Sequence, residues 1–331
     1  MESQYFKFKI PYSSIENIML QNNYNQIYFY IDLMSIARGF YNVNVVELEL
    51  SEYVNNLQEN IEYLPYRFIH EAKDFYNKIF KYFQKYNPKF ITFFDDGSCI
   101  QNKNLLNSYK NTSASKGIAS YITEQWKINL MHDIKKYYLD IFLKHFNINN
   151  LSCCIDLDDY EADLVPHYIL DKNLLNSRSN KILNVILSTD KDLLQTCKFP
   201  NVIQSISLYK KKESKIEFNI YDNQTGISYI YKNFKRGILD CNYIPLILAI
   251  SGDKADEING IQNIGPSKAC KLIEMYRLPH KINKYTDFVD EKLNSHKNLI
   301  LNNYKITCFE EQIHRIPYTK ISYIDETIKI I

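Results

Sequence analysis

The chain has 331 residues, of which 45% are hydrophobic and 24% are charged, and its formal net charge is +2. This balance is typical of a folded globular protein and excludes a disordered one, and the length allows one large domain or two ordinary ones. The longest apolar run, Tyr243 to Ile250, is too short to span a bilayer, and residues 1–10 lack the pattern of a secretory leader. We therefore expect a cytoplasmic protein with no membrane partner.

The cysteines and histidines argue against transition-metal chemistry. Seven cysteines are scattered without a CxxC spacing, and seven histidines form no pattern such as HExxH. Reduced, buried thiols are the simplest interpretation, and a zinc site is disfavoured. The small net charge conceals acids gathered in short motifs and lysines gathered in runs such as Lys210 to Lys212. That distribution suits a basic groove around an acidic centre, although an AT-rich genome would produce the same lysine and tyrosine bias.

Three apolar runs predict buried strands, at 26–33, 89–94 and 182–187, with helices expected at 35–40 and 68–86. Acidic residues end or follow each strand: Asp32, then Asp95 and Asp96, then Asp190 and Asp192. Strands separated by helices indicate an α/β fold with a parallel central sheet and flanking helices. Ligand sites of such sheets lie beyond the carboxyl ends of the strands, so we expect these acids to converge at one edge.

The remainder of the chain suggests a second lobe. Residues 98–117 form a polar stretch that is too long for an ordinary connection. After Pro200, runs at 202–208 and 216–221 predict a hairpin, and helical segments then dominate, with Pro266 fitting a first helical position. We expect an α/β domain at 1–205 and a mainly helical lobe at 206–331, whose last forty or so residues have no clear motif.

The acids in these segments predict a metal site of hard cations. Two like charges about 4 Å apart cost roughly 4 kcal/mol at an effective dielectric near 20, so a shared pocket requires bound cations or raised pKa values. Oxygen ligands without Cys or His select Mg²⁺ or Mn²⁺, and two such ions suit phosphoryl displacement. The candidate ligands are Asp32, Asp95, Glu161, Asp163, Asp190, Asp192, Asp253 and Asp256.

Each of these acids also has a purely structural interpretation. Asp158 followed by Glu161 fits a capping box, and Asp190 fits the cap of a helix that starts at Lys191. Strand-end acids also occur in phosphatases and receiver domains. The joint pattern favours a site, because independent caps have no reason to recur after every strand.

The motifs resemble, in their order and in their residue sequences, those of the 5′ nuclease family, which includes flap endonucleases and phage 5′→3′ exonucleases with ribonuclease H activity. The matching segments lie between about Ile27 and Leu272 and read IDLMSIAR, ITFFDDG, DYEAD, STDKDLLQ and GDKADEINGIQNIGPSKA. The last segment is the most specific, since it is similar to the family's helix–three-turn–helix, here at about 243–276. The resemblance implies a PIN-like 5′ nuclease domain followed by a DNA-binding lobe.

The resemblance also implies roles for the acids. Asp32, Asp95, Asp163 and Asp190 look like ligands of the first metal, and Asp192, Asp253 and Asp256 look like ligands of the second. Glu161 looks like a metal-site carboxylate that orients the attacking water. Asp95 is preferred to Asp96 because it directly follows the strand.

Nucleic acid is the expected partner. Glycine turns and a helix N-terminus in the three-turn segment expose amides that can hold a phosphate, with K⁺ as a possible bridge. The stretch 98–117 matches the position of the family's arch, where Tyr109 and Lys110 look like its aromatic residue and catalytic lysine. The arginines expected around that pair are absent. The expected nucleic-acid contacts are Arg38, Lys103, Tyr109, Lys110, Lys116, Gly260, Ile264, Gly265, Ser267 and Lys268.

We therefore expect a two-metal 5′→3′ exonuclease or flap endonuclease that acts on 5′ ends of DNA and RNA–DNA hybrids. RNA primer removal in replication or repair would be its use. The length resembles that of a free-standing, monomeric phage enzyme, with a single-strand-binding protein or sliding clamp as candidate partners. The alternative within the fold is a branched-DNA-binding relative that no longer cleaves. A small-molecule phosphatase is disfavoured, since a small substrate needs no duplex grip.

Overall fold

The computed structural model describes residues 10–33, 35, 75–94, 100–106, 109, 152–157, 159–176, 178–210, 215–230 and 239–329. Within these ranges, no helix has both the length and the apolarity needed to cross a bilayer.

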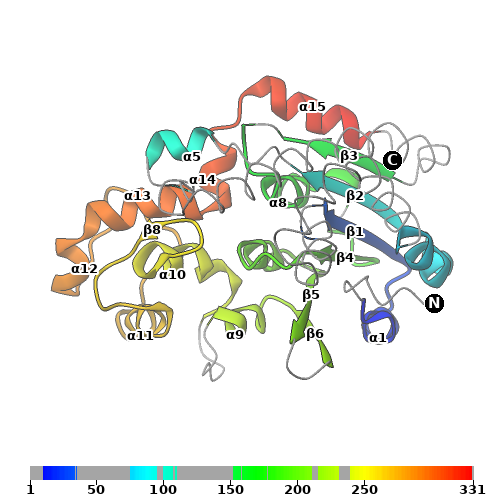
Figure 1. Ribbon diagram of the computed structural model, residues 1–331, viewed down its shortest axis with the longest axis horizontal. Helices are drawn as coiled ribbons and strands as arrows, with labels where there is room; N and C mark the ends of the chain where they lie inside the picture. The colour runs from blue at the N-terminus through cyan, green and yellow to red at the C-terminus, as the bar shows by residue number, and fades with distance from the viewer. Residues whose placement is uncertain are drawn as a thin grey trace, which may run out of the picture.

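A six-stranded sheet forms the centre of the first part of the chain (Figure 1). Its strand order is β3-β2-β1-β4-β5-β6, in which β1 to β5 pair in parallel and β6 is antiparallel to β5. The strands are β1 (Gln26–Asp32), β2 (Lys89–Phe94), β3 (Ser152–Asp156), β4 (Ile182–Leu187), β5 (Val202–Lys210) and β6 (Lys215–Tyr221). The chain builds outward in one direction from β1 and in the other from β4. The crevice between the ends of β1 and β4 is therefore the topological switch point, where open α/β sheets bind ligands.

Alternation along β1 divides the sheet into two buried faces. Ile27, Phe29 and Ile31 pack on one face, which is covered by α1 (Tyr12–Gln21) and by the helical segment 75–86. Tyr28 and Tyr30 belong to the opposite face, whose core continues into α8 (Leu164–Asp171) and the helical lobe. Both faces of the sheet are thus covered, as the nearly continuous apolar strands require.

The second part of the chain is mainly helical and lies beside the sheet (Figure 1). The helix α10 packs against α11 and α13. The elements of this second part are α9 (Gly226–Ile230), η6 (Cys241–Tyr243), α10 (Ile244–Ser251), β7 (Gly252–Asp253), β8 (Ile258–Asn259), α11 (Pro266–Tyr276), α12 (Glu291–Ser295), α13 (Lys297–Thr307), α14 (Phe309–Ile313) and α15 (Tyr318–Ile328). Shorter elements of the first part are η1 (Gln84–Tyr86), α5 (Ile100–Leu105), η4 (Leu174–Asn176) and η5 (Asp192–Lys198).

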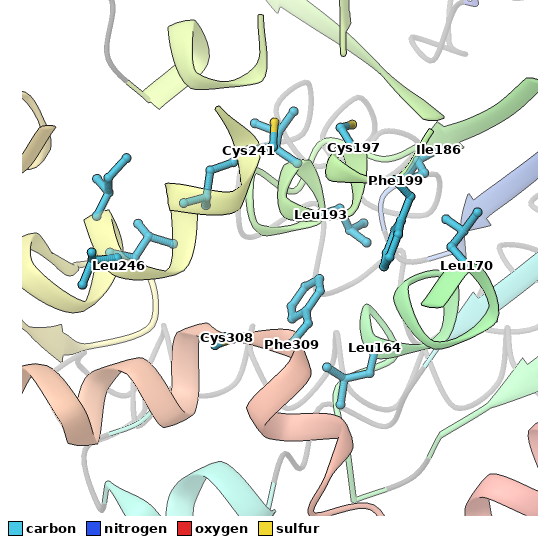
Figure 2. Close-up of a cluster of buried hydrophobic side chains, with 14 of the residues drawn as sticks. Leu164, Leu170, Ile186, Leu193, Cys197, Phe199, Cys241, Leu246, Cys308 and Phe309 are labelled. Carbon is cyan, nitrogen blue, oxygen red and sulfur yellow. The ribbon is translucent and has the colours of Figure 1, made fainter. Parts of the chain in front are cut away.

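One hydrophobic core joins the sheet to the helical lobe. Figure 2 shows Phe309 of α14 beside Leu164 of α8 and Leu193 of η5, with Leu246 of α10 in the same cluster. Leu164, Leu193 and Phe309 are each at most 1% exposed. Because this core contains residues from both parts of the chain, the helical lobe is held in a defined position over the carboxyl ends of the strands.

The structure confirms the strands expected at 89–94 and 182–187 and the hairpin that follows Pro200, and α11 begins at Pro266 as expected. The domain boundary expected at residue 205 falls inside β5, and the sheet continues to Tyr221. Pro166 does not break α8, because that helix begins at Leu164 and its first-turn N–H groups need no helical partner. Of the helix expected at 35–40, only Ser35 lies within the described residues.

Candidate metal centre

The centre begins with a hydrogen-bonded link between the ends of β1 and β4. Asp32 is the last residue of β1 and is 7% exposed. Its Oδ2 accepts from Ser188 Oγ at 2.6 Å and from Ser35 Oγ at 2.5 Å, while its Oδ1 accepts from the Ser35 amide at 3.0 Å. Ser188, directly after β4, also accepts from the Asp190 amide at 3.0 Å. Topology therefore places the segments of Asp32 and Asp190 next to each other at the switch point.

Hydrogen bonds from the neighbouring strand β5 hold the segment around Asp190 in place. Gln204 of β5 is fully buried, and its Nε2 donates to the carbonyls of Ser188, at 3.2 Å, and Asp190, at 2.6 Å. Asp190 Oδ1 accepts from the Asp192 amide at 2.9 Å, where η5 begins. The expected cap is not formed, because Lys191 is the N-cap residue of η5 and makes no side-chain capping hydrogen bond; Asp190 instead closes a turn just before that helix. A carboxylate has further lone pairs, so this contact leaves it able to act as a ligand.

Three carboxylates converge from segments far apart in the sequence. One oxygen from each of Asp192, Asp253 and Asp256 lies within 4.8 Å of the other two. Asp192 begins η5, whereas Asp253 ends β7 and Asp256 lies in the turn before β8. At 4.8 Å, two like charges repel by about 3 kcal/mol at an effective dielectric near 20. The arrangement brings together the residues that the sequence assigned to the second metal.

Electrostatics within this cluster are unbalanced without a cation. Burial, followed by the neighbouring Asp190 carboxylate, raises the pKa of Asp192 well above its usual value. Asp192 Oδ1 is buried and has no hydrogen-bond partner. An all-oxygen donor set that includes a buried carboxylate oxygen without a hydrogen-bond partner fits a hard divalent ion such as Mg²⁺ or Mn²⁺.

Among the described residues, Lys191 brings a positive charge into contact with this cluster. Its Nζ forms an ion pair with Asp253 Oδ2 and lies 3.9 Å from Asp192 Oδ1. Although burial opposes it, the carboxylates of Asp192 and Asp253 raise the pKa of Lys191, which therefore stays protonated. The sequence reasoning missed this role, and its signal was the position of Lys191 between two acids in STDKD.

Two further expected site acids, Glu161 and Asp163, lie just before α8. Glu161 is 9% exposed and accepts a hydrogen bond from the Tyr109 hydroxyl. The capping box expected at Glu161 does not form at the start of a helix, since α8 begins at Leu164 with Asp163 as its N-cap residue. Asp163 makes no side-chain capping hydrogen bond there. The two residues are therefore not explained as helix caps.

The expected helix–three-turn–helix is formed by α10, the β7–β8 hairpin and α11 (Figure 1). Gly265 is the N-cap of α11, and the exposed Ser267 and Lys268 occupy its first turn. Ile264 is instead buried, and its amide donates to the Ile261 carbonyl at 3.0 Å, so it supports the turn from inside. Since Asp253 ends β7, this motif supplies acids of the carboxylate cluster and, in addition, the exposed N-terminus of α11.

The last helices brace this motif. Asn303 of α13 is 3% exposed, and its Nδ2 donates to the carbonyls of Ala249, at 3.0 Å, and Asn259, at 2.8 Å. Lys292 Nζ donates to the Gln262 carbonyl at 3.0 Å. The residues left unassigned by the sequence therefore hold the turn in place.

Five of the expected site residues need separate mention. Lys103 lies partly buried on α5, in the first part of the expected arch. Arg38, Asp95, Lys110 and Lys116 lie outside the described residues.

Proteins of known structure share this fold. The structure of T5 5′-exonuclease with bound zinc ions gives a TM-score of 0.56 at 16% identity, over 92% of this chain and 98% of that one. The T5 D15 protein co-crystallised with metal ions gives a TM-score of 0.59 at 13% identity, over 92% of this chain and 99% of that one. A third match, at a TM-score of 0.56 and 15% identity over 92% of this chain and 99% of that one, is the bacteriophage T5 D15 flap endonuclease with DNA and metal ions. The chain therefore has the 5′ nuclease fold.

Curated protein sequences give shorter matches. The DNA polymerase I of Borreliella burgdorferi is 30% identical over 172 residues, which is 49% of this chain and 16% of the polymerase. The DNA polymerase I of Caldicellulosiruptor bescii is 29% identical over 169 residues, 49% of this chain and 17% of that one. The chain thus spans less than a fifth of the length of these relatives. No protein-family model matches it.

Proposed function

We propose that this chain is a divalent-metal-dependent 5′ nuclease that cleaves phosphodiester bonds near 5′ ends of DNA and RNA–DNA hybrids. The observation that carries the proposal is the convergence of Asp192, Asp253 and Asp256 on a 5′ nuclease fold. The proposed use is removal of RNA primers, or trimming of flaps, in DNA replication and repair. A free-standing phage-type monomer in the cytoplasm, working with a single-strand-binding protein or a sliding clamp, is part of the same proposal.

The acids divide into two sets of proposed ligands. Asp32, Asp163 and Asp190, together with Asp95, would hold the first ion, and Asp192, Asp253 and Asp256 would hold the second. Two hard divalent ions at such a site supply charge stabilisation to both the attacking and the leaving oxygen of a phosphodiester.

Other side chains prepare the site for that reaction. Tyr109 fixes Glu161 through its hydroxyl, which suits the proposed role of Glu161 in orienting the attacking water. Lys110, the next residue, is proposed to stabilise charge on the scissile phosphate. Ser35 and Ser188 fix the rotamer of Asp32, so that its carboxylate is preorganised.

The three-turn motif would anchor the duplex away from the cut. The first turn of α11 presents its positive dipole end together with the exposed Lys268, a combination that attracts phosphate. K⁺ is proposed as a bridge between this turn and the DNA backbone. Lys103 and Lys116 of the arch, with Arg38, are the proposed contacts to the 5′ strand.

The proposal is tested with a 5′-labelled flap DNA and a labelled RNA–DNA hybrid, each incubated in Mg²⁺ and in EDTA. The wild-type protein should cleave in Mg²⁺ alone, and Asp190→Ala should reduce cleavage by several orders of magnitude. Asp287→Ala is the matched control, because Asp287 is exposed and remote from the centre in sequence. Cleavage that survives EDTA or Asp190→Ala would contradict the two-metal mechanism. Tight DNA binding without cleavage in Mg²⁺ would favour the non-cleaving relative instead.

A further inference from the structure

Lys191 occupies the place of a cation among the acids of the second proposed ligand set. Its ammonium contacts Asp253 and lies 3.9 Å from Asp192 Oδ1, so it bridges residues from η5 and β7. Asp253 Oδ1 already accepts from the Ala255 amide at 3.0 Å, and Lys191 takes the other oxygen, Oδ2. One oxygen from each of the three acids lies within 4.8 Å of the other two, and the Lys191 ammonium contacts two of these acids, so a cation bound among them would lie close to that ammonium.

An ammonium and a divalent ion cannot share this position. Mg²⁺ binds carboxylate oxygens at about 2.1 Å, and its charge repels a neighbouring ammonium strongly in a partly buried site. Lys191 has a flexible four-carbon stem, and its side chain is 30% exposed, so it can turn toward solvent without opening a cavity.

We propose that Lys191 is an internal counter-cation, which offsets part of the negative charge of the Asp192–Asp253–Asp256 cluster in the metal-free protein and is displaced when the second metal binds. The inference rests on the proposed function, because it takes these acids as metal ligands. It has two consequences. Lys191 stabilises the fold when metal is absent, and it weakens the affinity for the second ion, because that ion must break an existing ion pair.

Metal binding measured by calorimetry with Mn²⁺, without DNA, tests the second consequence. Lys191→Met should bind the second Mn²⁺ roughly twofold to fivefold more tightly than wild type, the gain expected when one competing ion pair is removed. Lys254→Met is the matched control, since Lys254 is exposed and adjacent to Asp253. It removes the same charge near the site without removing the ion pair, and it should change the affinity much less. The melting temperature in EDTA should fall for Lys191→Met and stay near wild type for Lys254→Met.

A second measurement uses the wild-type protein alone, so it does not depend on the folding of a variant. Acetylation of lysines by acetic anhydride, followed by mass spectrometry, should show Lys191 several-fold more reactive with saturating Mn²⁺ than with EDTA. Unchanged reactivity, or a Lys191→Met protein that binds Mn²⁺ no more tightly than wild type, would overturn the inference while leaving the metal centre intact. If neither wild type nor Lys191→Met binds Mn²⁺, the proposed metal centre fails as well.

Discussion

Two glycines of the three-turn motif should respond very differently to the same substitution. A Cβ at Gly260 would lie 2.0 Å from the Ser251 carbonyl carbon and 2.4 Å from the Gly252 nitrogen. These are backbone atoms, so the residue after β8 would have to move away from the last residue of α10. A Cβ at Gly265 would meet no atom within 4 Å, and its φ of −86° is allowed for alanine. Gly260 is thus required by packing, whereas packing does not require Gly265.

The expected costs follow from these contacts. Overpacking against a rigid neighbour costs about 1–3 kcal/mol, and because the Gly260 contact is backbone to backbone we expect Gly260→Ala to reach about 3 kcal/mol. At Gly265, alanine is a poorer N-cap than glycine by about 0.5–1 kcal/mol, but it restricts the unfolded chain by a similar amount. The free energy of unfolding of Gly265→Ala should therefore stay within about 1 kcal/mol of wild type.

DNA affinity should separate the two variants further. If a phosphate approaches the first turn of α11, the new methyl group of Gly265→Ala should weaken duplex binding although the fold is intact. Urea unfolding followed by circular dichroism measures the stabilities, and fluorescence anisotropy of a labelled duplex in EDTA measures binding. A Gly260→Ala protein as stable as wild type would refute the packing argument. Wild-type duplex affinity of Gly265→Ala would refute the phosphate-binding role of this turn.

Three further expectations concern stability. Asn303→Ala should lower the free energy of unfolding by about 2–4 kcal/mol, since the buried carbonyl of Ala249 and the partly buried carbonyl of Asn259 lose their donor; a loss below about 1 kcal/mol in urea would contradict this. Burial lowers the pKa of His167, so only the unfolded state takes up that proton, and stability should fall as pH drops below about 6.5. His167→Gln should flatten that part of the pH profile of urea midpoints. Although burial opposes it, hydrogen bonds and charge from Lys198 and Lys281 lower the pKa of Glu310 to about 2. The contribution of ionised Glu310 to the free energy of unfolding should therefore be complete above pH 4.5 and be lost between pH 4.5 and pH 2. Glu310→Gln should remove this pH dependence.

Local sequence was sufficient for much of the sheet and for the motifs. The runs that became β2 and β4 are mostly apolar, and burial of both sheet faces makes such runs recognisable without knowledge of their partners. The acids of STDKD could be assigned to the edge of the sheet, because parallel strands end at a common edge. Those of GDKADE were assigned to the same site through the resemblance to the 5′ nuclease family. In contrast, β3 was missed, since Ser152 to Asp156 is short and carries few β-branched residues.

Tertiary structure decided the features that depend on distant partners. Nothing local distinguishes Gly260 from Gly265, because the difference lies in how closely the end of α10 approaches each one. Asn303 belongs to a segment with no motif, and it acquires a role only where α13 packs against α10. The sequence by itself determined that acids and a helix–three-turn–helix are present. Only the packing of the helical lobe against the sheet brings Asp253 and Asp256 to Asp192, and places Lys191 among them, since charges interact through space and not along the chain.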